Sequence, residues 1–157
     1  PGSTEPGRAI FRDCPLDLAH FHSQREKLFP DLDLEFTEEK IENAIDRVSA
    51  EAKPRHMERV PMDAQFDFEL IFDLYTFTDK QLLKTLFQGM RLLEDDYLGG
   101  SGTRGSGKIH FTTMQMIYRD MAYYQTEQPE AVLAQNFELS QITNDWLNDV
   151  AGKITFA

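Results

Sequence analysis

Apolar side chains occupy every second position of residues 66 to 75 and alternate with Asp67, Glu69, Ile71, Asp73 and Tyr75, the clearest period-two pattern of the chain. The apolar set comprises Phe66, Phe68, Leu70, Phe72 and Leu74. Because successive side chains of a β-strand point to opposite faces, the pattern predicts a strand with one face on a core and the other partly solvated.

A helical pattern follows directly after this strand. Thr78 and Gln81 have the spacing of a capping box, in which two side chains bond backbone groups at a helix N-terminus. Apolar side chains then recur every three or four residues, at Leu82, Leu83, Leu86, Phe87, Met90, Leu93 and Tyr97. The stripe ends at Gly99-Gly100, residues typical of a helix C-terminus. We expect an amphipathic helix here.

Weaker patterns occupy the first 60 residues. The apolar run 9–12 lies between turn-forming residues, which predicts a short strand. A helical turn is expected over 20–28, within an otherwise irregular and polar stretch. After Thr37, a candidate N-cap, apolar residues have helical spacing over 41–48 and predict a short amphipathic helix that ends at Pro54.

The C-terminal part is expected to hold one more strand and two helices. The strand is predicted over 108–111, after a glycine-rich loop, and the helices over 130–137 and 140–150. The second helix presents apolar side chains at fourfold spacing, those of Ile142, Trp146 and Val150. We expect these side chains to dock on the domain.

Composition is that of one globular domain. The chain has 157 residues, 41% of them hydrophobic, and a mean hydropathy of −0.47. It contains no run near the roughly 18 to 20 apolar residues of a membrane span, and its first residues lack a signal-peptide pattern. The single cysteine, Cys14, excludes a disulfide framework and a cysteine-based zinc site. We expect Cys14 to be a small buried residue and the protein to be cytoplasmic.

The formal net charge is −11, from 16 basic and 27 acidic residues. This balance argues against a protein whose whole surface binds nucleic acid, but a local basic strip remains compatible with it. Residues 99–119 form such a strip, because they contain Arg104, Lys108 and Arg119 and no acidic residue.

The glycine-rich loop over 99–108 matches two nucleotide-binding patterns. Its residues 100–105 satisfy GxGxxG, and residues 102–108 satisfy GxxxxGK. Both patterns require a loop that follows a strand and opens a helix, whereas here the predicted order is helix, loop, strand. Ile109 also stands where a phosphate-binding loop needs a Ser or Thr for magnesium. Nucleotide binding is therefore disfavoured.

The chemistry of the loop nevertheless suits phosphate. Five glycines within nine residues permit positive φ angles, so that successive amides can converge on an anion. Cationic and hydroxyl side chains add donors: Ser101, Thr103, Arg104, Ser106 and Lys108. The alternative is a flexible connector, and composition alone does not separate the two.

Three blocks resemble one family. The first, over 91–109, reads RLLEDDYLGGSGTRGSGKI; the second reads ENAIDR, KPRHMERVP and FDFE between residues 42 and 69; the third, over 7–13, reads GRAIFRD. In their order along the chain, 7–13, 42–69 and 91–109, the blocks resemble the RAMP superfamily, and within it the repeated backbone subunit of type III CRISPR interference complexes. The resemblance covers residues 7 to about 111.

This resemblance implies an α+β fold, a modified ferredoxin-like (RNA-recognition-type) palm with a projecting thumb hairpin. It implies a palm over 1–119 with the thumb inserted around 42–61, and we expect residues 120–157 to be a helical extension that docks on the palm or a neighbour. The extended thumb conflicts with the helix predicted over 41–48. We follow the resemblance from Pro54 onward and leave the preceding residues open.

The resemblance also implies the RNA-binding residues. The guide RNA (crRNA) loop would comprise Gly99, Gly100, Ser101, Gly102, Thr103, Arg104, Gly105, Ser106, Gly107 and Lys108. The thumb, which enters the guide–target duplex, would include Lys53, Pro54, Arg55, Met57, Glu58, Arg59 and Val60. Its cations can meet phosphates, and Met57 and Val60 can wedge against a base. Without the resemblance, an ordinary basic loop would be favoured.

Members of this family often cut target RNA with a metal-assisted Asp in an N-terminal loop, and no residue of this sequence matches that loop. Pro1-Gly2-Ser3 resembles the beginning of the family's Pro-Gly-Ser-Ser helix motif. We therefore expect residues to be absent after Ser3 and before Pro1. Magnesium is expected only for cleavage by the full subunit, and the segment itself is expected to hold no cofactor.

Two other groups of polar residues are weaker candidates for a metal-binding site. The acidic triplet 94–96 fits a solvated helix end or a subunit contact better than a metal site. The four histidines lack zinc spacing, and we interpret His20 and His22 as surface residues.

Three hypotheses follow. The first is a crRNA-binding backbone subunit that interacts with no membrane. Its partners are crRNA, target RNA, neighbouring RAMP subunits and other subunits of the effector complex. The second adds magnesium-dependent endoribonuclease activity in the full subunit. The third is an acidic protein–protein interaction module whose glycine loop is only a connector.

Overall fold

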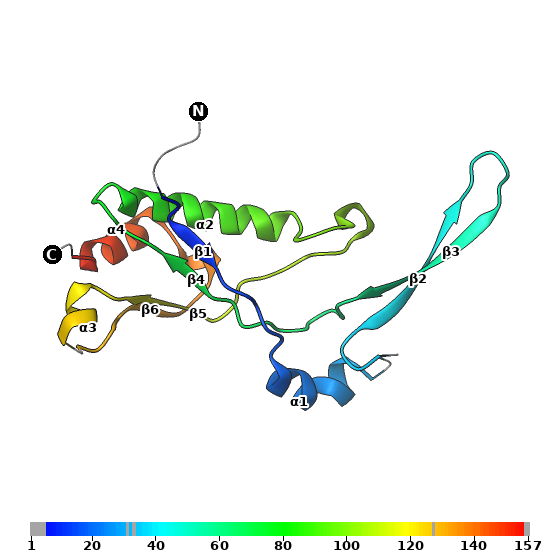
Figure 1. The fold of residues 1–157 in the computed structure, drawn as a ribbon, viewed down its shortest axis with the longest axis horizontal. Helices are drawn as coiled ribbons and strands as arrows, with labels where there is room; N and C mark the ends of the chain where they lie inside the picture. Colours follow the sequence, from blue (N-terminus) through cyan, green and yellow to red (C-terminus); the bar gives the residue numbers. More distant parts are fainter. Residues whose placement is uncertain (1–5, 31, 33, 127, 156–157) are drawn as a thin grey trace. The chain divides into compact units, whose positions relative to one another are not determined.

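The structure is a computed structural model that describes residues 6–30, 32, 34–126 and 128–155 (Figure 1). It divides into two compact units, residues 1–73 and 74–157. Helices and two-stranded antiparallel sheets alternate along the described residues, which confirms the predicted α+β class. Residues 1–3, on which the helix-motif expectation rests, lie outside the described part of the chain.

The first unit contains a short sheet of β1 (Ala9–Phe11) and β4 (Leu70–Phe72). β1 confirms the first predicted strand, but β4 is much shorter than the alternation over 66–75 predicted. The partner strand limits it, because β1 is only three residues long. Beyond it the pairing continues as single contacts, such as the bridge between Leu16 and Phe66.

Helix α1 (Leu18–Leu28) confirms the helical turn expected over 20–28 and begins two residues earlier. The Asp17 carboxylate caps it by accepting the His20 N–H at 2.8 Å. Fully buried Phe21 stacks on Phe29 with ring centroids 4.6 Å apart and also contacts Phe36. This aromatic cluster anchors the segment between α1 and the next strand.

Two residues near this helix correct or refine the sequence analysis. Cys14 is exposed, so the prediction of a buried cysteine is wrong. His22 is exposed as expected, whereas His20 is half-buried beneath the helix cap.

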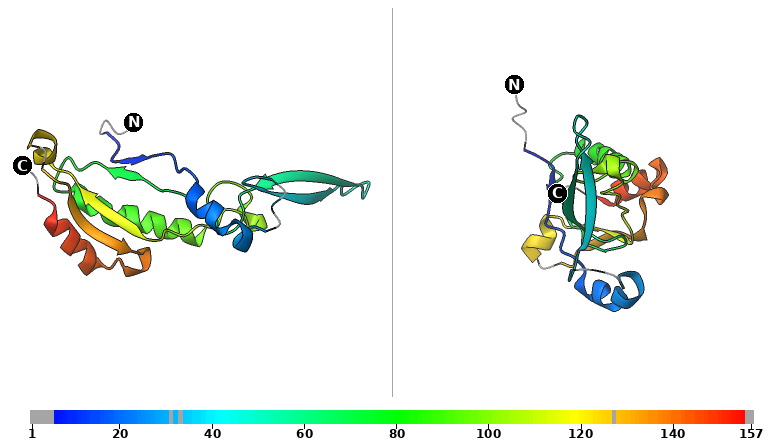
Figure 2. Two further views of the ribbon diagram at one scale, coloured as in Figure 1. Left: turned by 90° about the horizontal axis from the view of Figure 1, so that it is seen from below. Right: turned by 90° about the vertical axis from the view of Figure 1, so that its right-hand side faces the viewer.

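Strands β2 (Glu38–Ile45) and β3 (Ala52–Arg59) form a long antiparallel hairpin, drawn as a twisted two-stranded ribbon in Figures 1 and 2. The helix predicted over 41–48 is therefore wrong, and the extended projection implied by the family resemblance is present. A helix with that apolar stripe needs a core to cover it, yet Ile41 and Ile45 are 61% and 67% exposed. The cross-strand hydrogen bonds of the hairpin stabilise the strand instead.

The second unit is built on helix α2 (Asp79–Asp95), which buries Leu83, Phe87 and Met90 as its stripe predicted. Its N-terminus differs from the predicted capping box, because the Thr78 side chain makes no capping hydrogen bond. The buried Asp79 carboxylate instead accepts the N–H groups of Tyr75 and Thr76, each at 2.8 Å. Asp79 thus fixes the turn that leads into the helix.

A second hairpin, β5 (Met114–Tyr118) and β6 (Ala131–Phe137), is joined by the short helix α3 (Met121–Thr126). The strand predicted over 108–111 is wrong, since the ladder begins only at Met114. The helix predicted over 130–137 is also wrong. Those residues gain backbone partners from β5, and their buried side chains Leu133 and Phe137 lie on the core side of a strand.

The C-terminal residues complete the core of the second unit. The short 3-10 turn η2 (Leu139–Gln141) leads into α4 (Asn144–Lys153), which confirms the last predicted helix with a later start. The core joins α2 to this tail through Phe87, Met90, Phe137, Leu139 and Ile142, with Trp146 packed against them. Within the described residues, no helix is both long and apolar enough to span a membrane.

Candidate nucleic-acid interface

The glycine-rich loop leaves the C-terminus of α2 and folds into a tight turn. Its centre is a single 3-10 turn, η1 (Gly102–Arg104), flanked by Ser101 at φ 62° and Gly105 at φ 79°. Gly99 and Gly107 also have positive φ angles, 82° and 85°. These are left-handed conformations that glycine adopts at little cost, which is the physical reason for the glycines at 99, 105 and 107.

Backbone hydrogen bonds close the loop on itself. The Leu98 N–H donates to the Gly107 carbonyl at 2.8 Å, which joins the two ends. The Ser101 carbonyl accepts the N–H groups of Arg104 at 2.9 Å and Ser106 at 3.3 Å, and Gly105 donates to Gly102. The prediction that successive amides converge on an anion is therefore wrong for residues 104 to 106, because those amides are used inside the turn. The turn is a folded element with internal hydrogen bonds rather than a structureless connector.

One face of the turn borders a surface hollow of about 390 Å³, lined by Asp95, Asp96, Tyr97, Gly102, Thr103, Gly105, Ser106 and Lys108. Five of the ten residues predicted to bind guide RNA thus meet around one space. The others, Gly99, Gly100, Ser101, Arg104 and Gly107, lie outside this lining, and Arg104 is exposed to solvent. A phosphate would be favoured near Lys108 and disfavoured near the two carboxylates.

The acidic triplet divides between two roles. The Glu94 carboxylate accepts the Phe111 N–H at 2.7 Å and lies 3.7 Å from His110 Nδ1, so it fastens the exit of the loop to α2. Asp95 and Asp96 face the hollow instead. In the part of the chain that the structure describes, no three His, Cys, Asp or Glu side chains are grouped so as to hold a metal ion.

The register of the β2–β3 hairpin sorts its side chains into two chemically different faces. Directly opposed residues share a face, and neighbours alternate. One face, here called the basic face, carries Glu38, Lys40, Glu42, Ala44, Lys53, Arg55, Met57 and Arg59. The other, the apolar face, carries Glu39, Ile41, Asn43, Ile45, Ala52, Pro54, His56 and Glu58. All four Lys and Arg residues of the two strands therefore lie on the same side.

Several of these cations already pair within the hairpin. Arg59 bonds Glu38 across the strands, Lys40 lies 3.2 Å from Glu42, and Lys53 is 4.0 Å from Glu51 at the tip. The Lys53–Glu51 pair is solvent-exposed, so it holds its cation weakly, whereas Lys40 and Glu42 are half-buried. Four cations against two carboxylates leave the basic face net positive although the whole chain is strongly negative.

The structure separates the predicted thumb residues. Lys53, Arg55 and Arg59 share the basic face, as contact with phosphates requires. Met57 lies on the same face as these cations, and Val60 lies beyond the end of β3, so their contact with a base stays a prediction. The remaining predicted residues, Pro54 and Glu58, lie on the apolar face.

Sequence reasoning missed the exposed Ile41 and Ile45 on the apolar face, because it assigned them to a helix. The alternation over 38–45 did not clearly indicate a β-strand, since both faces mix charged and apolar residues. At the far end of that face, His56 Nδ1 lies 2.5 Å from Glu39 Oε1. Only the pairing of β2 with β3 shows which residues are neighbours.

Comparisons with known proteins agree on one group. The CRISPR system Cms endoribonuclease Csm3 of Methanocaldococcus jannaschii is 37% identical over 155 residues, which cover 97% of this chain and 59% of the relative. The Streptococcus thermophilus protein of the same name is 43% identical over 112 residues, 69% of this chain and 48% of the relative. The Mycobacterium tuberculosis one is 36% identical over 131 residues, 73% of this chain and 53% of the relative. The chain thus spans about half the length of these relatives.

A solved structure indicates the same group of proteins. The chain resembles one described as the Csm3–Csm4 subcomplex in the type III-A CRISPR–Cas interference complex, with a TM-score of 0.60 and 29% identity. The match covers 98% of this chain and 60% of that one. No family model matches the sequence.

Proposed function

Because the chain belongs to the RAMP backbone subunits of type III CRISPR complexes, we propose that it binds crRNA and shapes the guide–target duplex. The observation that carries the proposal is the glycine-rich turn, which is closed by its own hydrogen bonds and brings Thr103, Ser106 and Lys108 to one hollow. Such a turn contacts phosphates without reading bases, which suits a guide-holding subunit because base pairing selects the target.

The hairpin supports the same function independently. Its basic face presents Lys40, Lys53, Arg55 and Arg59 along two paired strands. A row of cations on a long ribbon suits an extended phosphate backbone, and it is confined to one face of an acidic chain. The alternative of an acidic interaction module without an RNA role is not favoured. It would leave the row of cations on the basic face and the closed glycine-rich turn without a function.

A second activity is proposed for the whole protein of which these residues form a part. The relatives are named endoribonucleases, and we expect the full-length protein to cut target RNA with Mg²⁺. No residue of this chain is assigned to that step. Target cleavage with Mg²⁺ and its loss with a chelator would support this activity, whereas equal cleavage in both conditions would contradict the role of the metal.

The partners are proposed from the structural neighbour. Since that structure joins Csm3 to Csm4, we expect this chain to contact neighbouring RAMP subunits and other subunits of an effector complex. We also expect the protein to act in the cytoplasm, as a subunit of such a complex.

The decisive experiment measures RNA affinity across salt concentrations. The double variant Arg104→Ala/Lys108→Ala removes both loop cations, and Lys84→Ala removes an exposed cation of α2 as a matched control. With a single-stranded guide-length RNA, each lost phosphate contact should lower the slope of log K against log salt by about 0.7. The double variant should therefore bind RNA more weakly, with a slope smaller by about 1.4. The Lys84→Ala control should keep the affinity and the slope of the unaltered chain. Unchanged affinity and slope would refute the assignment of the loop.

A further inference from the structure

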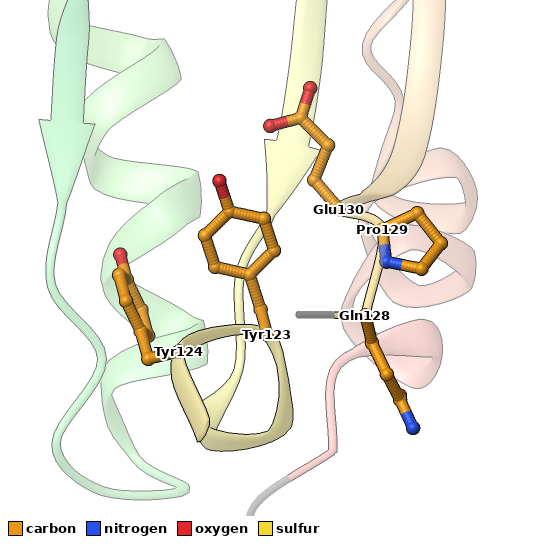
Figure 3. A pocket seen from close by; sticks show the side chains of 5 residues that line it. All are labelled: Tyr123, Tyr124, Gln128, Pro129 and Glu130. Carbon is orange, nitrogen blue, oxygen red and sulfur yellow. The ribbon is translucent and has the colours of Figure 1, made fainter. Parts of the chain in front are cut away.

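A surface hollow of about 590 Å³ lies where α3 leads into β6 (Figure 3). Its lining comprises Tyr123, Tyr124, Gln128, Pro129 and Glu130. The connection between β5 and β6 supplies all of these residues, and the RNA-binding function proposed above uses none of them. In Figure 3 both tyrosine hydroxyls and the Glu130 carboxylate point toward the same side of the hollow.

The two tyrosines form an aromatic corner. Their ring centroids are 5.0 Å apart, and the ring planes meet at 89°. Tyr124 is 69% exposed, so its ring is open to a ligand. The face of a tyrosine ring attracts cations, and two perpendicular rings can contact one cation from two sides.

The chain itself shows which chemistry this corner accepts. The guanidinium carbon of Arg119 lies 5.2 Å from the centroid of the Tyr123 ring. Arg119 Nε and Nη2 both donate to Glu130 Oε2, at 3.0 and 2.9 Å. One guanidinium is thus already held by a tyrosine face and a carboxylate. Because both bonds end on Oε2, the second oxygen, Glu130 Oε1, lies outside this pair and keeps its acceptor capacity.

The charge around the hollow favours a cation over a phosphate. Glu130 is one carboxylate of the lining, and Asp120, whose Oδ1 accepts the Tyr123 N–H at 2.9 Å, places a second one at the backbone of a lining residue. Arg119 balances only one of the two. Ile117 and Val132 pair across the adjoining strands and remain 40% and 45% exposed, which offers apolar area beside the charged hollow.

We infer that this hollow binds an arginine or lysine side chain of a protein partner. The cation would lie against the exposed Tyr124 ring and donate to Glu130 Oε1, while apolar groups of the partner cover Ile117 and Val132. Neither Arg104 nor Lys108 lines the hollow, so this interaction can be tested separately from guide-RNA binding.

The test uses the full chain, labelled with ¹⁵N, and two synthetic probes. One is acetyl-Gly-Arg-Gly-Arg-Gly-amide, and its matched control carries the neutral isostere citrulline in place of each arginine. The arginine peptide should shift the amide resonances of residues 119–131 in a saturable manner, and the citrulline peptide should not. Tyr124→Phe, which keeps the ring, should retain these shifts, whereas Tyr124→Ala and Glu130→Gln should lose most of them. Gln125→Ala, on the same helix but outside the lining, should behave as the unaltered chain.

Three outcomes would overturn the inference. Equal shifts with the citrulline peptide would show that charge is not recognised. Absence of saturable shifts with the arginine peptide would show that the hollow takes no cation. Shifts of the same resonances with octauridylate, and none with the arginine peptide, would identify a base-stacking surface for RNA instead. Each result is separable from the loop assignment, because Arg104→Ala/Lys108→Ala should leave the peptide response unchanged.

Discussion

A side-chain carbon at Gly102 would overlap the aromatic ring of Tyr97, so this ring lies directly against the backbone of the glycine-rich turn. A carbon at Gly107 would likewise overlap the Leu98 carbonyl oxygen, at a φ of 85°. The end of α2 and the turn are thus packed together through two glycines that leave no room for a side chain.

This packing predicts different effects for three glycines. Gly102→Ala and Gly107→Ala should distort the turn and weaken guide-RNA binding, with strain of roughly 1–2 kcal/mol at Gly107 from its left-handed backbone. Gly100→Ala is the matched control, since nothing lies within 4 Å of its added carbon and its φ is not positive. Filter binding measures the RNA affinity, and circular dichroism verifies the fold. Equal losses for all three variants would contradict a specific role of the packing.

The two faces of the hairpin predict opposite behaviour for adjacent residues. Arg55→Ala removes a cation from the basic face, so RNA affinity and its salt dependence should both fall, with a slope decrease of about 0.7 for one contact. His56→Ala, one residue later on the apolar face, should change the salt slope little. The same salt titration measures both, and a larger slope change for His56→Ala would contradict the assignment of the basic face.

Lys80 should stabilise the second unit through the end of α4. Its Nζ donates to the carbonyl oxygens of Ala151 and Ile154, each at 2.8 Å. A cation at a helix C-terminus satisfies carbonyls that lack helical partners. Lys80→Met keeps the aliphatic stem and should lower the free energy of unfolding by about 1.5–3 kcal/mol. Urea denaturation measures this, with the exposed Lys84→Met as the control that should change little.

The aromatic cluster beneath α1 should be a local source of stability in the first unit. Phe21 is fully buried between Phe29 and Phe36, and Phe21→Ala should cost about 3–5 kcal/mol. Hydrogen exchange should become faster over α1. The second unit should keep its exchange rates, because its core is separate. Uniform acceleration across both units would show that they unfold together.

The stability of the hairpin tip should depend on pH through the Asp46 carboxylate. Its Oδ1 accepts the N–H groups of Ser49 at 3.0 Å and Val48 at 2.8 Å, and these backbone hydrogen bonds lower the pKa of the carboxyl below its ordinary value. Since the folded pKa is the lower one, the stabilisation is present above the unfolded pKa and disappears as the pH falls through the folded value.

The measurement is the exchange rate of the tip amides between pH 5 and 2. Protection of the Val48 and Ser49 amides should fall in the acid part of this range, and Asp46→Asn should reduce that dependence. Ala50→Gly is a useful companion, because Ala50 has a φ of 56° that glycine adopts more readily. A pH profile unchanged by Asp46→Asn would contradict the role of this carboxylate.

The sequence by itself determined the elements whose signals are local. The apolar stripe of α2 identified its buried face, the glycines marked a turn with positive φ angles, and the run at 9–12 identified β1. The motif blocks identified the family, because a glycine pattern after a helix depends only on neighbouring residues. Short-range sterics and helical periodicity act within a few residues, so the sequence alone is enough to predict their effects.

Only the tertiary structure decided the elements that depend on a distant partner. The spacing of Ile41, Ala44, Ile45 and Val48 fits a helix, but pairing with residues 52–59 makes it a strand. Residues 131–137 likewise become a strand because β5 supplies their hydrogen-bond partners. The sorting of cations onto one face and the pairing of Arg119 with Glu130 also depend on register and chain reversal. A strand gains most of its stability from contacts with residues far along the chain, and no local pattern encodes which residues those will be.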